Sequence, residues 1–189
     1  MKASDDYPAL VLPHYQKVWG ANVAERRLLR GPTHELPRGF RVLEFEPTAV
    51  FAPWVYATSG MSPAPGADGV RLELHLYSPQ ADESLVELLT VITHYHATAP
   101  RLGLHHTVNF GRPWLRGSAC DRGFISLPYP HGPSLQWLDL GTSSVECLWL
   151  IPVTPAEVEY KQANGAEALE VVFEQRQFNY LDPARPSVC

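Results

Sequence analysis

The sequence lacks the features that mark secreted and membrane-spanning proteins. Its three cysteines, Cys120, Cys147 and Cys189, show neither a CxxC spacing nor the even number of a disulfide framework, so we expect reduced thiols. No run of residues approaches the roughly 18 apolar positions that cross a bilayer. The acidic N-terminal stretch MKASDDYPALVLPHYQ does not resemble a signal peptide. The sequence therefore predicts a cytoplasmic protein that does not enter a membrane.

Clusters of basic residues are also missing. The net charge is −5 at pH 7, and no block of Lys and Arg occurs. Nucleic-acid binding rests on clustered positive charge, so nucleic acid is disfavoured as a partner. A mildly acidic surface suits a basic protein partner instead.

The sequence is rich in apolar and turn-forming residues. Hydrophobic residues make up 45% of the 189 positions, and the chain holds 18 prolines, five Trp, eight Tyr and seven Phe. This composition predicts many turns that join short, aromatic-rich strands. The length fits a single domain over residues 1–189, with a core over about 7–178 and a flexible tail over 179–189.

Hydrophobic periodicity predicts an α+β fold. The stretch VRLELHLYS at 70–78 alternates as a strand does, whereas 78–100 repeats apolar residues every three or four positions, as an amphipathic helix does. VECLWLIPV at 145–153 is nearly continuously apolar, which indicates a central, buried strand. TPAE at 154–157 is a capping box that begins a helix, and a second helix follows at 166–178. We expect a mostly antiparallel or mixed sheet of about six or seven strands, with helices packed on one side.

Four of the eight histidines fall within the segment 94–106. His94 and His96 lie two apart near a helix end, so their side chains diverge by about 200°. His105 and His106 are adjacent, and in an extended chain they point to opposite faces. A zinc site needs three or four protein ligands, so we predict no metal site. The alternative is a His-dependent enzyme, with or without zinc, that uses this segment.

Other catalytic patterns are absent from the sequence. It contains no GxSxG, GxGxxG or Walker motif. Cys147 lies in an apolar run and is interpreted as an inert core residue, while Asp121 beside Cys120 raises rather than lowers the pKa expected for that thiol. We therefore predict no catalytic and no cofactor-binding residues, and we interpret the protein as a non-enzyme.

The remaining candidates are aromatic and basic residues in two loop-rich stretches, RPWLRG and LPYPHGPSLQW. Aromatics together with arginine are enriched at protein-binding hot spots. The sequence therefore predicts a partner interface formed by Arg112, Trp114, Arg116, Tyr129 and His131.

Five motifs occur in an order that resembles the Suppressor of fused (SUFU) domain family: WVYATSGMS, RLELHLYSP, ELLTVITHYH, GLHHTVNFGRP and VECLWLIPVTPAEVEYKQANGAEALEVVF. The resemblance runs from about Tyr7 to Phe178 and is strongest to bacterial, single-domain members. His106 matches the histidine of the family's G-H-T strand, whereas Leu104-His105 departs from the glycine that usually precedes it. The resemblance implies an α+β domain similar to the N-terminal half of the animal protein.

The resemblance also implies a function. The animal protein is a non-enzymatic binding factor that holds Gli-type transcription factors, and similar bacterial domains are proposed to be immunity proteins. These neutralise polymorphic or contact-dependent toxins by binding the toxin domain in the cytoplasm. We expect a protein partner of this kind, with a regulatory binding protein unrelated to toxins as a further alternative.

Overall fold

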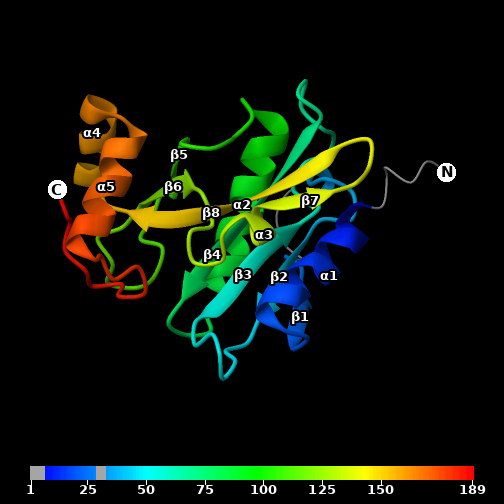
Figure 1. The fold of residues 1–189 in the computed structure, drawn as a ribbon, viewed down its shortest axis with the longest axis horizontal. Coiled ribbons are helices and arrows are strands. Elements are labelled where there is room, and N and C mark those ends of the chain that lie inside the picture. The colour runs from blue at the N-terminus through cyan, green and yellow to red at the C-terminus, as the bar shows by residue number, and fades with distance from the viewer. Residues whose placement is uncertain (1–6, 29–32) are drawn as a thin grey trace.

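Within residues 7–28 and 33–189, which the computed structural model describes, one sheet of eight strands forms the middle of the fold (Figure 1). Residues 1–6 of the acidic N-terminal stretch lie outside this part of the chain. The strands are β1 (Val23–Arg26), β2 (Arg41–Phe45), β3 (Trp54–Ser59), β4 (Val70–Ser78), β5 (Thr107–Asn109), β6 (Arg122–Ser126), β7 (Trp137–Asp139) and β8 (Ser144–Val153).

The sheet is mixed because one central pair of strands is parallel. The strand order is β1-β2-β3-β4-β8-β6-β5, and β7 pairs with the first residues of β8. β4 and β8 run parallel, from Val70 opposite Ser144 to His75 opposite Trp149. The other paired strands run antiparallel. The mixed α+β fold and the central, buried position of β8 confirm the sequence predictions.

Helices cover both faces of the sheet, so the expectation that they gather on one side is wrong. One face is covered by a single long helix, and the other by helices from both ends of the chain. No helix in the described residues is long and apolar enough to span a bilayer. The first face is covered by α2 (Ser84–Thr98), next to the short 3₁₀ helix η2 (Thr33–Glu35). The second face is covered by α1 (Tyr7–Trp19), α3 (Pro133–Gln136) and α5 (Ala166–Arg176), and α4 (Pro155–Asn164) lies beside α5 (Figure 1).

β4 shows why two helical layers are needed. Its leucines face α2, as the alternation predicts, but the opposite face, with Glu73, His75 and Tyr77, is buried as well. α1 covers this second face: Tyr7 donates a hydrogen bond to Glu73, and the Trp19 ring lies 5.2 Å from the His75 ring. The polar residues of β4 therefore belong to a second core rather than to the solvent side of the sheet.

The Glu73 carboxylate is fully buried, and four donors surround it. The Tyr7 hydroxyl and the backbone amides of Gly60 and Met61 donate to Oε1 at 2.8–3.0 Å, and the Thr58 hydroxyl donates to Oε2 at 2.5 Å. Burial raises the pKa of Glu73, and these hydrogen bonds oppose that shift. Gly60 has φ +90° and leaves only 3.2 Å between a notional Cβ and the Phe40 backbone, so this turn requires glycine.

The C-terminal segment 179–189, for which the sequence predicts a flexible tail, makes several contacts with the rest of the molecule. Arg185 is 5% exposed and donates to both oxygens of the buried Glu157 carboxylate, at 2.6 and 2.8 Å. Arg185 also donates to the Pro152 carbonyl, and the Val188 amide donates to Glu157. Glu157 is the same residue that completes the predicted capping box with Thr154. The Glu157 carboxylate thus caps the first turn of α4 and also binds the C-terminal segment through Arg185 and Val188.

His75 is a buried polar residue of a different kind. Its ring lies 5.2–5.3 Å from the rings of Trp19 and Tyr77, and neither ring nitrogen has a hydrogen-bond partner among the described residues. Burial, and then the nearby His131, lower the pKa of His75 to about 3. The folded state therefore keeps this imidazole neutral.

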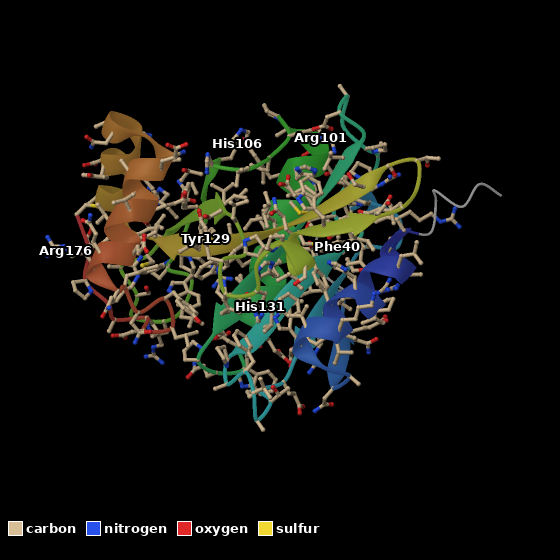
Figure 2. The ribbon with its side chains drawn as sticks, viewed as in Figure 1. Phe40, Arg101, His106, Tyr129, His131 and Arg176 are labelled. Carbon is tan, nitrogen blue, oxygen red and sulfur yellow. The ribbon has the colours of Figure 1, made fainter. Side chains whose placement is uncertain are left out.

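Replacing Arg185 with methionine should lower the free energy of unfolding by about 3–5 kcal/mol, because the buried Glu157 would lose its cation. The control is Arg176→Met at an exposed arginine, which Figure 2 shows at the outer edge of the molecule. That change should alter stability by less than about 0.5 kcal/mol. Urea denaturation at pH 7 measures both, and equal losses would contradict the docked C-terminal segment.

Acid should weaken the fold through His75. The unfolded chain takes up the imidazole proton near pH 6.5, whereas the folded chain resists it down to about pH 3. The stability contributed by the neutral ring is therefore complete above pH 6.5 and is lost as the pH falls. Between pH 6.5 and 4.5 the wild type should lose about 2 kcal/mol more than His75→Phe.

Urea midpoints of the wild type and His75→Phe at both pH values test this difference, since all other titrating groups are shared. His106→Phe makes the same substitution at an exposed histidine and serves as the matched control variant. An equal loss of unfolding free energy between pH 6.5 and 4.5 in the wild type and in His75→Phe would contradict the lowered pKa of His75.

Candidate functional site: an aromatic groove with an acidic rim

A groove of about 590 Å³ opens between the sheet and α5. Its volume lies within the range of ligand-binding pockets. The sheet side is contributed by β6, β8 and the loop after β6, and the opposite side by α5 and the residues that follow it. The lining residues are Ser126, Tyr129, Pro130, Trp149, Ile151, Glu167, Glu170, Val171, Phe173, Glu174, Gln177, Phe178 and Tyr180.

Aromatic rings form the apolar part of the groove. The Trp149 and Tyr180 rings meet edge to face, with centroids 5.0 Å apart, and the Phe173 and Phe178 rings stack at 4.3 Å. Phe178 and Tyr180 reach this position because Gln177 adopts a left-handed conformation, φ +48°, that ends α5 and turns the chain back. The Phe178 amide then donates to the Phe173 carbonyl, as in a Schellman C-cap.

Three glutamates of α5 form the rim. Glu167, Glu170 and Glu174 are spaced by three and four residues, so they share one face of the helix. The described residues that line the groove include these three carboxylates and no Lys or Arg. The groove therefore combines an apolar floor with a negative edge.

Two hydroxyl groups fix the central glutamate of this rim. Ser126 donates to Glu170 Oε1 at 2.5 Å, and Tyr129 donates to Oε2 at 3.1 Å. Partial burial, and then the charge of Glu170, raise the pKa of Tyr129 to about 12, so the phenol remains a donor at neutral pH. The Glu170 carboxylate is therefore held in one place before any partner arrives.

Of the five predicted interface residues, Tyr129 alone lines this groove. His131 lies farther along the same loop, and Figure 2 shows Tyr129 on the α5 side of it. His131 is half-buried, accepts a hydrogen bond from the Trp19 indole at 3.0 Å and packs on Phe51. Its role in the structure is to join this loop to α1.

The other three predicted residues lie elsewhere. Trp114 is 1% exposed and belongs to the core beneath α2, where its indole donates to Ser118. Arg112 pairs with Glu87 at the start of α2, and Arg116 is exposed. Because the candidates are divided between the two faces of the sheet, they do not form one surface.

The structure separates the four histidines: His94 and His96 lie on α2, as the helical period predicts, whereas His105 lies in a left-handed turn before β5 rather than on a strand. His94 pairs with Glu35, and His106 is exposed (Figure 2). His105 turns toward Phe124, and its ring stacks on that ring at 6.0 Å. Among the described residues, no group of three or more His, Cys, Asp or Glu is arranged to hold a metal ion.

His96 has a structural role at the end of α2. The Leu102 amide donates to its Nδ1 at 3.1 Å, so Nε2 carries the proton and donates to Ser62 at 3.0 Å. Burial, and then the charge of Arg101, lower the pKa of His96 to about 4. Both ring nitrogens are therefore occupied in a neutral, buried imidazole.

The internal cysteines do not act as nucleophiles in this geometry. Cys147 is fully buried, and burial raises the pKa of its thiol. Cys120 is 1% exposed, and burial raises the pKa of this thiol as well. A reactive cysteine needs the opposite shift.

Sequence reasoning missed most of the groove. The sequence predicts Trp149 only as part of a buried strand and Phe178 only as the end of a helix, and it places Tyr180 in a segment expected to be flexible. The acidic spacing of Glu167, Glu170 and Glu174 was the one available signal, because it gives the predicted helix at 166–178 a single charged stripe.

Comparison with known proteins agrees with this fold. A family model described as Suppressor of fused protein (SUFU) matches residues 37–186. The crystal structure of a SUFU homologue from Neisseria gonorrhoeae FA 1090 is similar at 32% identity and a TM-score of 0.85, covering 97% of each chain. No curated protein matches the sequence.

More distant structures share the fold. A chain from the Sufu-Fu complex crystal structure matches at 15% identity and a TM-score of 0.70, covering 96% of this chain and 91% of that one. Drosophila Suppressor of Fused matches with the same identity and TM-score over all of this chain and 54% of its own. The family match over most of the sequence, together with the Neisseria homologue, shows that this chain belongs to the Suppressor of fused family.

Proposed function

We propose that this protein is a non-enzymatic protein-binding domain that acts as an immunity protein. It binds a toxin domain in the cytoplasm and blocks that domain sterically. The observation that carries this proposal is the groove under α5, where an aromatic floor meets three carboxylates. Aromatic anchors with complementary charge are typical of protein interfaces.

Protein binding is also consistent with the family. One structure of the same fold was solved as a Sufu-Fu complex, in which that protein has a protein partner. The groove described here would give this chain a partner surface of its own. Its rim is prearranged by Ser126 and Tyr129, which lowers the entropy lost on association.

The alternative of a His-dependent enzyme finds less support in the geometry. His96 uses both ring nitrogens in the fold, and His94 pairs with Glu35 of η2. The Ser62 hydroxyl accepts the Nε2 proton of His96, so this buried pair lacks the free ring nitrogen that would activate a nucleophile. His105 and His106 face different surroundings. A regulatory binding protein unrelated to toxins would use the same groove. Identifying the bound partner distinguishes this alternative from an immunity protein.

Co-expression with the toxin encoded beside this gene tests the proposal. We expect growth to return to the level seen with an inactivated toxin, and we expect the two purified chains to elute as one complex in size-exclusion chromatography. The control strain carries the toxin with an empty vector. Killing that continues unchanged in the presence of this chain would overturn the immunity assignment.

A further inference from the structure

We propose that the groove under α5 receives an arginine side chain of the partner, with its guanidinium paired to Glu170 and its flanking residues on the aromatic floor. This inference rests on the proposed function, because it names the chemistry of the segment that the protein would bind. It goes further by assigning one ligand group to one carboxylate.

Charge is the first argument for a cation. Glu170 and Glu174 are four residues apart on α5, a spacing at which like charges repel and destabilise a helix. Glu167 adds a third negative charge to the same stripe. Arg176, the basic residue of the last turn, is exposed and lies at the outer edge of the molecule in Figure 2 rather than over the groove. A cation from outside would relieve this repulsion.

The hydrogen bonding of Glu170 is the second argument. An ionised carboxylate has about four acceptor positions. Ser126 and Tyr129 occupy one position on each oxygen, while the His105 ring nitrogen stays 3.7 Å from Oε1. Each oxygen therefore keeps a position for another donor, which is the arrangement that a forked guanidinium satisfies with two parallel hydrogen bonds.

The aromatic floor favours arginine over lysine. A planar guanidinium stacks on aromatic faces and is weakly hydrated, whereas the compact ammonium of lysine holds its water. Tyr180 and Phe178 line the same groove as the three glutamates, and the Tyr180 ring meets the buried Trp149 ring edge to face. The remaining apolar wall, with Ile151 and Phe173, can cover residues on either side of the arginine.

The test uses the full chain and three capped peptides of one length. The first carries a central arginine between leucine and phenylalanine, and the others replace that arginine with citrulline, which keeps its shape without the charge, or with lysine. Two-dimensional NMR follows the amides of residues 126–130 and 167–180 and the Trp149 indole during titration. We expect chemical-shift changes at these positions with the arginine peptide. The citrulline peptide should bind at least about tenfold more weakly than the arginine peptide, because a charged hydrogen-bonded pair is lost.

Two matched variants place the effect on one side chain. Glu170→Gln removes the charge at nearly constant volume and should lower the affinity for the arginine peptide by about tenfold or more. Glu159→Gln changes the net charge equally at an exposed position of α4 that does not line the groove, and it should bind like the wild type. Urea midpoints confirm that both variants fold.

Each outcome decides one point. Equal binding of the arginine and citrulline peptides, or shifts confined to another surface, would overturn the arginine site. Shifts that depend only on protein concentration would assign the groove to a second copy of this chain and also overturn it. If the wild type rescues cells and Glu170→Gln rescues them equally, the immunity function stands and the arginine site fails. If the peptide binds but no toxin is neutralised, the site stands and the immunity function fails.

Discussion

The buried carboxylate of Glu73 is the constraint on which much of the fold depends. A charge removed from water must be matched by donors, and here the donors come from three separate parts of the chain: the Tyr7 hydroxyl at the start of α1, the Thr58 hydroxyl on β3, and the amides of the turn at residues 60–61. The same turn continues to Ser62, whose hydroxyl pairs with His96 at the end of α2. One network therefore connects both helical layers through the sheet, and the family motif around residues 54–62 is the sequence that builds it.

A second buried carboxylate repeats this solution at the other end of the sheet. Glu157 caps α4 and holds Arg185, so the segment after α5 folds back along the molecule. The returning segment brings Phe178 and Tyr180 to β8, where they meet Trp149. The groove is thus a product of two rigid supports, β8 on one side and the fastened C-terminal segment on the other. A site built between such supports loses little conformational freedom when it is occupied.

The sequence predicts the parts of this fold that depend on local pattern. The capping box at Thr154, the strand at 145–153 and the placing of His94 and His96 on one helix follow from spacing alone, and the structure confirms them. What the sequence does not reveal depends on long-range partners. The polar side of β4 resembles a solvent face until α1 covers it, and α1 itself contains Pro13, which disfavours a helix over this stretch. Glu157, the partner of Arg185, lies 28 residues earlier in the sequence. The local sequence of the proline-containing C-terminal segment therefore does not indicate that it packs against the rest of the molecule.

The departure from the family pattern at His105 shows how local backbone conformation and long-range contacts combine. The backbone there has φ +64°, a left-handed conformation that glycine adopts freely and other residues adopt at a cost. Histidine is held in it because its carbonyl accepts a hydrogen bond from Lys161 and its ring stacks on Phe124. That placement sets its Nε2 3.7 Å from Glu170, at the edge of the groove. The shared motifs include the support around Glu73 and also part of the groove, with Trp149, Glu170 and Phe173. Tyr129, Phe178 and Tyr180 lie outside the motifs.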